Sequence, residues 1–331
     1  MMPEKKKMEQ VRTLIEERGR KALKMSKQAI LNEQMDYKPL REALRYFMEE
    51  TWSHVPHPAL LSLTCEAVGG QPDATTQVGA ALALLAGAAD IHDDIIDQST
   101  IKGSKPTVFG KFGRDIALLA GDTLLFKGLY AMHEAVESLP EGKKQAVLKL
   151  TKQAFFGISS AEAQEAGFRG NPDLSAQEFL ENIKGKAAVA EATAKIGATL
   201  GDANANEIER LGNYGKTLGI LMTIRDQFID LFEPDEIKER AERECLPLPI
   251  LFVFRDEKDR KKIERLLKKG DKITKEDTDK IVDIVMTTKE TRKLRRQMQR
   301  MIKNGKAQLA SAKHDPRSLK FILESIMEDL E

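Results

Sequence analysis

The carboxylates within the stretch Ala88–Asp97 have the residue type and spacing best suited to chemistry. Asp93 and Asp97 are four residues apart, so on a helix they lie one above the other on one face, with Asp94 beside them. Three acids this close repel one another unless a cation lies between them. Carboxylate oxygens are hard ligands, so the expected cation is Mg²⁺, which usually completes its coordination with water and substrate phosphate. The stretch therefore predicts a helix that binds a diphosphate through Mg²⁺.

The alternative for this stretch is an acidic helix end in solvent, or an acidic N-cap, with no ligand at all. The residues that precede it, Val78 to Ala89, are almost wholly small or apolar. Such a helix is buried on most of its circumference, and a buried acid needs a partner. The flanking residues therefore favour the metal.

A second acidic pair lies far downstream, in Gly219–Asp230. Asp226 and Asp230 are again four residues apart and follow an apolar helical run. Two such helices that face each other across a bundle would hold a polyphosphate between metal ions. The predicted Mg²⁺ ligands are therefore Asp93 and Asp97 from the first motif, and Asp226 and Asp230 from the second.

The elements that must position these motifs are helical nearly throughout the chain. Apolar residues recur at helical spacing, only 5% of residues are aromatic, and no alternating run remains as a strand candidate. The longest predicted helices cover 74–98, 115–136, 143–167, 175–200 and 207–232, with a loop over 102–112. Ser175 with Glu178 has the pattern of a capping box. With no linker and no internal repeat, the sequence predicts a single all-α domain over residues 1–331.

Composition and charge argue against several classes of function. The chain has 331 residues and a net charge of +1, which gives no global field for nucleic acid or an anionic membrane. The densely charged part from about residue 255 is interpreted as solvated peripheral helices. Cys65 and Cys245 have neither disulfide nor metal spacing, which predicts a reduced, cytoplasmic location. No secretory signal is expected, and the longest apolar run, Val78 to Ala89, is too short to span a bilayer.

Taken with their spacing, these motifs resemble the trans-isoprenyl diphosphate synthases, the polyprenyl synthetase family. The resemblance extends roughly from Leu40 to Leu251. Its most specific segments are 93–97 (DDIID), 105–108 (KPTV), 120–125 (AGDTLL), 214–219 (YGKTLG) and 224–226 (IRD). It implies an isoprenoid synthase bundle with a central cavity for diphosphate and prenyl chain, and either a homodimer or a heterodimer with a homologue.

The resemblance also implies a reaction and a set of site residues. Mg²⁺ bound to the first motif grips an allylic diphosphate, and the second motif completes the metal cluster. Carbon–oxygen cleavage leaves an allylic cation, which the double bond of isopentenyl diphosphate attacks to give a chain longer by one isoprene unit. The residues that carry over as catalytic are Asp93, Asp94, Asp97, Lys186, Lys216 and Asp226, and those at substrate-binding positions include Lys102 and Gln227.

Most departures from the family pattern are at positions that bind one substrate, isopentenyl diphosphate. The basic segment that holds isopentenyl diphosphate in the family reads Ser53–Pro58 here, so only His54 and His57 could contact its phosphates. The arginine pair after the first motif aligns with Lys102 and Gly103, and Gln227 stands where an aspartate is usual. We therefore expect weak binding of isopentenyl diphosphate, which strengthens as His54 and His57 gain charge below a pKa of about 6.5.

Three functional readings remain open. The first is an elongating prenyltransferase, the second an enzyme that ionises an allylic diphosphate without isopentenyl diphosphate, as a cyclase or by transfer to another acceptor. The third is a degenerate subunit of a heteromeric synthase. The bulky aromatic that ends the prenyl pocket in the family is replaced by Ala88 and Ala89. With the next large side chain of that face at Leu85, the sequence predicts a medium or long prenyl chain.

Overall fold

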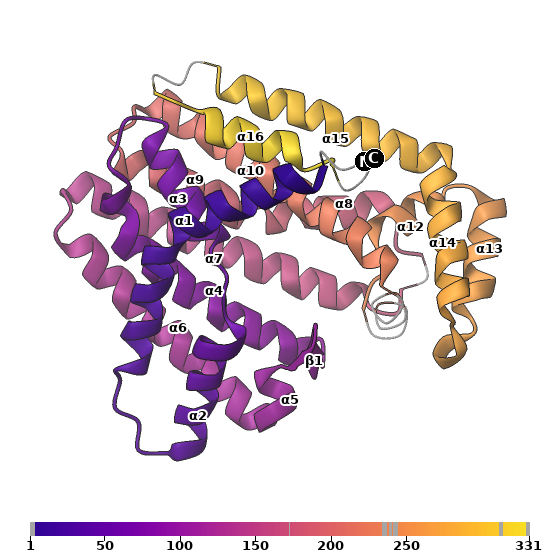
Figure 1. Cartoon of the computed structure of the whole chain (residues 1–331), viewed down its shortest axis with the longest axis horizontal. Coiled ribbons are helices and arrows are strands. Elements are labelled where there is room, and N and C mark those ends of the chain that lie inside the picture. The colour runs from indigo at the N-terminus through magenta and orange to yellow at the C-terminus, as the bar shows by residue number, and fades with distance from the viewer. Residues whose placement is uncertain are drawn as a thin grey trace. The chain divides into compact units, whose positions relative to one another are not determined.

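The computed structural model describes residues 4–171, 173–233, 237, 240, 244–310 and 314–328 (Figure 1). These residues are mainly helical and include one hairpin of two short strands, so the all-α prediction is confirmed. The helices before the hairpin are α1 (Glu4–Leu31), α2 (Lys38–Tyr46), η1 (Phe47–Thr51), α3 (Pro56–Glu66), η2 (Pro72–Thr75) and α4 (Thr76–Ile96). After it come α5 (Val108–Phe112), α6 (Arg114–Glu137), α7 (Glu141–Phe168), α8 (Ala176–Lys186), α9 (Ala188–Leu200), α10 (Ala205–Ile229), η3 (Asp230–Phe232), α12 (Leu248–Val253), α13 (Glu257–Leu267), η4 (Gly270–Lys272), α14 (Lys275–Thr287), α15 (Lys289–Gln308) and α16 (Arg317–Ser325).

The chain divides into two compact units. The first unit comprises residues 1–152, 192–212 and 311–319, and the second comprises 153–191, 213–310 and 320–331. Each aspartate motif belongs to a different unit. That the two units form one domain over residues 1–331 stays a prediction.

The first unit is built around α4, which packs mainly on α6 and also on α1 and α3. Small residues let the helices approach closely, because a side chain at Gly128 of α6 would collide with Leu85 of α4. Buried side chains around α4 form a core cluster that includes Phe47, Trp52, Leu84, Ala88, Ile91 and Leu124. This apolar packing holds α4 rigidly up to its last turn, where the carboxylates lie.

The end of α4 is closed by backbone hydrogen bonds. Gln98 adopts a left-handed conformation with φ of 57°, which is uncommon for a residue other than glycine. It lets the Ser99 N–H donate to the Asp94 carbonyl at 2.9 Å and the Gln98 N–H donate to Ile95 at 3.3 Å. This pattern satisfies carbonyls that would otherwise lack partners at a helix end, and it turns the chain back toward α4.

The reversed chain forms a hairpin, which the sequence did not predict. Strands β1 (Ile101–Lys102) and β2 (Lys105–Pro106) pair antiparallel, with Lys102 opposite Lys105. Gly103, with φ of 62°, supplies the tight turn, and α5 follows directly. Two-residue strands are too short to show an alternating pattern, so the segment predicted as a loop over 102–112 contains both a hairpin and a helix.

Elsewhere one predicted helix is interrupted. The helix predicted over 175–200 is two helices, α8 and α9, which meet at Ala187, although the Ser175–Glu178 capping box is present. Close packing of Gly219 of α10 against Ala187 and Ala190 accompanies the break, and no proline marks it. Helix α3 begins at Pro56, because proline is well accommodated in the first turn of a helix.

One helical segment within the described residues, Pro72–Ile96, has the length and hydropathy of a membrane span. In this structure 61% of the most apolar 18-residue stretch of this segment is buried against other residues. Core helices of soluble proteins meet the same criteria, so the segment is weak evidence for a span.

Candidate active site

The first aspartate motif occupies the last turn of α4. The Asp97 N–H donates to the Asp93 carbonyl at 2.8 Å, so these residues lie on consecutive turns of one face, as the spacing predicts. Both are partly exposed, whereas Asp94 is buried. Burial raises the pKa of Asp94 to about 7, while the positive charge of Lys102 opposes the rise and the neighbouring aspartates add to it. Negative charge is therefore costly here and favours a cation.

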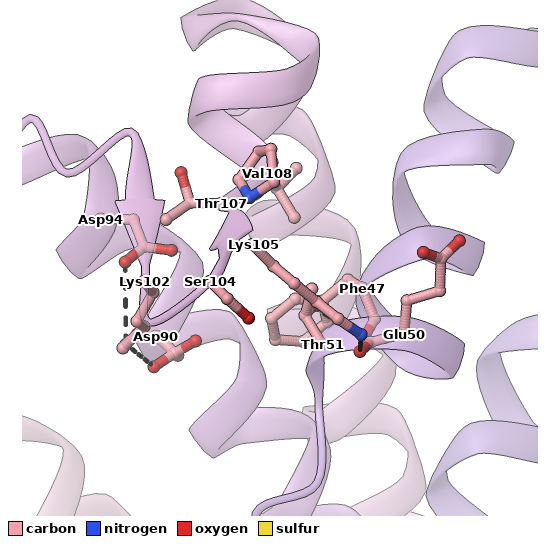
Figure 2. Close-up of a pocket in the computed structure, with 11 residues that line it drawn as sticks. Phe47, Glu50, Thr51, Asp90, Asp94, Lys102, Ser104, Lys105, Thr107 and Val108 are labelled. Atoms are coloured by element: carbon pink, nitrogen blue, oxygen red, sulfur yellow. Dashed lines mark hydrogen bonds and ion pairs between the residues drawn. The ribbon is translucent and has the colours of Figure 1, made fainter.

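The hairpin brings a lysine to this turn. The Lys102 ammonium lies 2.6 Å from an oxygen of Asp90 and 3.7 Å from one of Asp94 (Figure 2). Asp90 was not among the predicted site residues. It stands four residues before Asp94, so the spacing that singled out Asp93 and Asp97 could also have identified it.

These residues fit Mg²⁺ in the manner usual for phosphate-bound magnesium. Carboxylates are the ligands that this ion prefers, and Mg²⁺ is commonly held by one or two of them with substrate phosphate and water. Among the described residues, no group of three or more histidine, cysteine, aspartate or glutamate side chains is already gathered as a metal site. Asp93 and Asp97 would thus supply two ligands and leave the remaining positions to a bound diphosphate and water.

A pocket of about 290 Å³ lies between the hairpin and the end of α4. In Figure 2, Lys102 reaches the carboxylates of α4, and on the other side the Lys105 ammonium donates a hydrogen bond of 2.6 Å to the Glu50 carbonyl. The pocket is lined by Phe47, Glu50, Thr51, Asp90, Asp94, Lys102, Ser104, Lys105, Pro106, Thr107 and Val108. Lys105 was missed as a site residue, and the Gly103–Ser104 turn is the signal that could have placed it opposite Lys102.

The two histidines of the Ser53–Pro58 segment lie beside this site but remain neutral. His54 stacks on Trp52 at a ring distance of 5.3 Å and contacts His57 at 5.1 Å. Burial and, to a lesser extent, the nearby positive charge of Lys102 lower the pKa of His54 to about 4. Burial and the proximity of His54 likewise lower the pKa of His57 to about 3. The expected pKa near 6.5 is therefore wrong, and neither side chain gains charge in mildly acidic solution.

The second motif is arranged differently. Asp226 is exposed and lies 3.5 Å from the guanidinium of Arg225, while Asp230, in η3, pairs with Arg240 at 2.8 Å. Burial raises the pKa of Asp230, and Arg240 opposes that rise. Each carboxylate of this motif thus already has a cationic partner within the second unit.

Gln227, predicted to bind substrate, is buried. Its side-chain oxygen accepts a hydrogen bond from the Leu248 N–H at 3.1 Å, at the start of α12. That N–H belongs to the first turn of a helix and has no partner within the helix. The side chain therefore has a structural contact that the sequence did not indicate.

The two predicted lysines of the second unit are both paired with glutamates. Lys186 lies 2.6 Å from Glu165 and 3.0 Å from Glu162. Burial disfavours its charge, but the two carboxylates outweigh burial and raise the pKa of Lys186. Lys216 lies 3.3 Å from Glu191. A diphosphate bound by these lysines would have to compete with carboxylates that are already in place.

Comparison with known proteins decides the family. The profile of the family described as polyprenyl synthetase matches residues 38–285. The chain belongs to the polyprenyl synthetase family. It is 32% identical over 226 residues to a geranylgeranyl diphosphate synthase of Sulfolobus acidocaldarius, covering 68% of this chain and 65% of that protein. It is also 32% identical over 222 residues to a short chain isoprenyl diphosphate synthase of Methanothermobacter thermautotrophicus, covering 65% of this chain and 67% of that protein.

Solved structures of polyprenyl synthetases have the same fold. The geranylgeranyl pyrophosphate synthetase of Pyrococcus horikoshii superposes with a TM-score of 0.84 at 26% identity, over 97% of this chain and 98% of that one. That of Geoglobus acetivorans has a TM-score of 0.81 at 20% identity, over 96% and 98% of the two chains. The sequence matches to the two curated relatives, by contrast, span only about two thirds of the length of those proteins.

In this polyprenyl synthetase, the three residues predicted to shape the prenyl pocket have different environments. Ala88 is only 2% exposed and belongs to the core cluster around α4. Ala89 is exposed and precedes Asp93 by one helical turn. Leu85 is partly buried and packs where Gly128 of α6 leaves room for it. A substitution at Ala89 therefore probes the helix face of Asp93 without disturbing the core.

Within this polyprenyl synthetase, the predicted site residues form two groups. The first unit holds Asp93, Asp94, Asp97, Lys102, His54, His57, Leu85, Ala88 and Ala89, and the second unit holds Lys186, Lys216, Asp226, Gln227 and Asp230. In the first group, Lys102 lies 3.7 Å from Asp94, its charge acts on His54, and His54 contacts His57. That the two groups face each other across a shared cavity stays a prediction.

Proposed function

We propose that this protein is a Mg²⁺-dependent trans-prenyl diphosphate synthase that joins an allylic diphosphate to isopentenyl diphosphate. The observation that carries the proposal is the pocket at the end of α4, where Asp90 and Asp94 lie with Lys102 and Lys105. Asp93 and Asp97 belong to the same end of that helix, on consecutive turns. Membership of the polyprenyl synthetase family supports it, as do the printed names of the relatives.

The roles of the side chains follow from their places. Asp93 and Asp97 would hold the metal, and bound Mg²⁺ would stabilise the negative charge that develops on the departing diphosphate. Lys102 and Lys105 would contact phosphate oxygens from the pocket side. The apolar core behind Asp94 excludes water from one side of the motif, which protects an allylic cation from premature hydrolysis.

Lys105 offers a replacement for the cations that the Ser53–Pro58 segment lacks. Lys102 and Lys105 are directly opposite in the hairpin, and like charges in that arrangement are destabilising unless an anion relieves them. Asp90 partly neutralises Lys102, whereas Lys105 contacts a main-chain carbonyl, which carries no net charge. Lys105 is therefore the cation of this pocket best placed to bind a phosphate.

We infer a product of the geranylgeranyl class, which is one isoprene unit longer than the fifteen-carbon class. Of the four similar proteins named above, three are geranylgeranyl diphosphate synthases, two of them with solved structures. The fourth is a short chain isoprenyl diphosphate synthase. The small, exposed Ala89 one turn above Asp93 is consistent with a pocket that extends beyond fifteen carbons. The medium or long chain expected from the sequence alone stays a prediction.

The test is to incubate the full chain with Mg²⁺ and farnesyl diphosphate, with and without isopentenyl diphosphate, and to identify products by mass spectrometry. We expect geranylgeranyl diphosphate only when both substrates and the metal are present. Diphosphate release that does not depend on isopentenyl diphosphate would instead assign the chain to cyclisation or to transfer onto another acceptor. No turnover at all by the folded chain would favour a subunit that needs a homologue.

The role of Lys105 is tested in the same assay. We expect Lys105→Ala to raise the KM for isopentenyl diphosphate about tenfold, since one charge-assisted phosphate contact is lost. Lys258→Ala, at an exposed lysine of α13, is the matched control. An unchanged KM in the Lys105 variant would remove this residue from the site while leaving the proposed reaction intact.

A further inference from the structure

Helix α15 carries a row of five exposed cations, which we call the α15 ridge: Lys289, Arg292, Arg296, Arg300 and Lys303. Their spacing of three or four residues places all five within an arc of roughly 80° on one side of the helix, at 100° per residue. The row is about 21 Å long at 1.5 Å per residue. Neighbouring cations are thus closer than the Debye length of about 8 Å, so their fields add.

The opposite side of α15 fixes the helix in the second unit. Leu294 and Met298 are fully buried, and Gly305 closely approaches Leu323 and Thr217. Helices α12 and α14 pack against α15, and Figure 1 shows α16 running alongside it. The α15 ridge is therefore held on a rigid helix and faces away from these contacts.

Other charged helices of the same unit neutralise themselves, and α15 does not. On α13 and α14, Lys261 pairs with Glu257, Lys262 with Asp259 and Lys280 with Glu276. Helix α15 has eight basic residues and one acid, Glu290, which is buried and paired with Lys293. In the part of the chain that the structure describes, none of the five ridge cations has an acidic partner.

This arrangement is unfavourable for the free protein. Like charges four residues apart destabilise a helix, and Lys289 also lies at the N-terminal, positive end of the helix dipole. The chain as a whole has a net charge of only +1, so the α15 ridge is a local concentration of charge and not part of a generally basic surface. An external polyanion would relieve the repulsion.

We propose that the α15 ridge docks the protein onto an anionic lipid surface. A straight row of long, flexible cationic side chains on a convex helix fits a flat array of lipid headgroups. Binding of single-stranded nucleic acid is less well matched, because α15 contains no aromatic residue on which bases could stack. The docking site is separate from the active site and goes beyond the proposed function, which nevertheless gives it a use: a prenyl diphosphate is an amphiphile that partitions into membranes.

The experiment measures co-sedimentation of the full chain with vesicles in the absence of any prenyl substrate. One set of vesicles contains about 30 mol% phosphatidylserine in phosphatidylcholine, and the other contains phosphatidylcholine alone. We expect binding to the anionic vesicles only, with an affinity that falls as salt is raised. Replacing all five ridge residues by glutamine should weaken this binding at least about tenfold, because each basic residue near such a surface contributes roughly fivefold.

The matched control removes the same amount of charge elsewhere in the unit, by replacing Lys258, Lys261, Lys262, Lys275 and Lys280 on α13 and α14 with glutamine. It should bind vesicles as the parent does. Circular dichroism and turnover of soluble substrates should be unchanged in the ridge variant, which separates this test from that of the proposed function. The proposal is wrong if the parent does not bind anionic vesicles, if both variants lose equal affinity, or if the parent binds polyuridylate more tightly than the vesicles.

Discussion

The two aspartate motifs share a spacing of four residues but differ in how their charge is balanced. In the first motif, Asp94 is buried near three other aspartates, and the Lys102 ammonium lies 3.7 Å from it. In the second, Asp226 lies near Arg225, and Asp230 pairs with Arg240. Burial raises the pKa of Asp94 to about 7 and that of Asp226 to about 6. Three neighbouring aspartates add to the rise at Asp94, whereas Arg225 and Arg240 oppose the rise at Asp226.

This difference bears on which motif binds metal strongly. A site at which neighbouring carboxylates repel one another gains more from a divalent cation than one at which arginines already offset that repulsion. The position usually occupied by a further aspartate in the second motif is Gln227, which is bound to the backbone of α12. We therefore expect the first motif to dominate metal binding and the second to assist it.

The largest expected effect is on the first motif itself. Replacing Asp93 or Asp97 by Ala should slow the release of diphosphate from an allylic substrate by at least about a hundredfold, because the metal that stabilises the leaving group loses a ligand. Asp226→Ala should cost only about tenfold, since that carboxylate is exposed and already near an arginine. Rates are measured at saturating Mg²⁺, with Asp283→Ala on α14 as the control. Equal losses from the two motifs would contradict the comparison.

A second prediction is that substitution of Gln227 affects the stability of the fold more than the reaction rate. Gln227→Asp restores the usual acid but shortens the side chain, so it can no longer reach the Leu248 N–H. A buried donor without a partner costs about 1–3 kcal/mol, and we expect the free energy of unfolding in urea to fall by that amount. Gln227→Glu, which keeps the reach of the side chain, is the matched comparison. A variant with aspartate that is both fully stable and faster would show that position 227 faces the metal.

A third prediction separates two adjacent alanines of α4. Ala88→Phe adds a large ring to a filled core, and overpacking of this kind typically costs 1–3 kcal/mol or more. Ala89→Phe points the ring out of the core on the face of Asp93, so it should preserve stability and shorten the product by about one isoprene unit. Thermal melts and product analysis distinguish the two effects. An unchanged product from a stable Ala89→Phe variant would mean that the prenyl chain does not run along this face.

The contrast between the motifs also shows what could be predicted from sequence. The apolar, small-residue run before Asp93 predicted a buried helix that ends in carboxylates, and α4 has that form. The spacing was informative because it depends only on helical periodicity. The capping box at Ser175 was predictable for the same reason, since all its contacts lie within four residues.

Contacts between distant parts of the chain could not be read from local spacing. The pairing of Asp90 with Lys102 depends on the left-handed turn at Gln98 and on the hairpin that follows. Gln227 meets a backbone N–H 21 residues later, and Lys186 meets glutamates of α7. The sequence suggested the chemistry of these residues, but their partners were set by tertiary packing.

The smallest expected effect is on the pH dependence of stability, and it tests whether His54 and His57 are neutral in the folded protein. In the folded protein the pKa of His54 is about 4 and that of His57 about 3, whereas both are near 6.5 in an unfolded chain. Between these limits the unfolded state binds more protons than the folded state, so both histidines should make stability fall as the pH is lowered from about 6.5 toward 4. Replacing both by Gln should reduce this slope by on the order of 1 kcal/mol per pH unit. Asp94, with its raised pKa, contributes in the opposite sense, but it is present in both proteins and cancels in the difference.

Urea unfolding of the parent and the His54→Gln, His57→Gln double variant at several pH values between about 4.5 and 7 gives the two slopes. His133→Gln, at an exposed histidine of α6, controls for the substitution itself. A slope that does not change in the double variant would mean that His54 and His57 are protonated in the folded protein. Both side chains would then be cations beside Lys102. They would add positive charge for binding isopentenyl diphosphate, which neutral histidines do not.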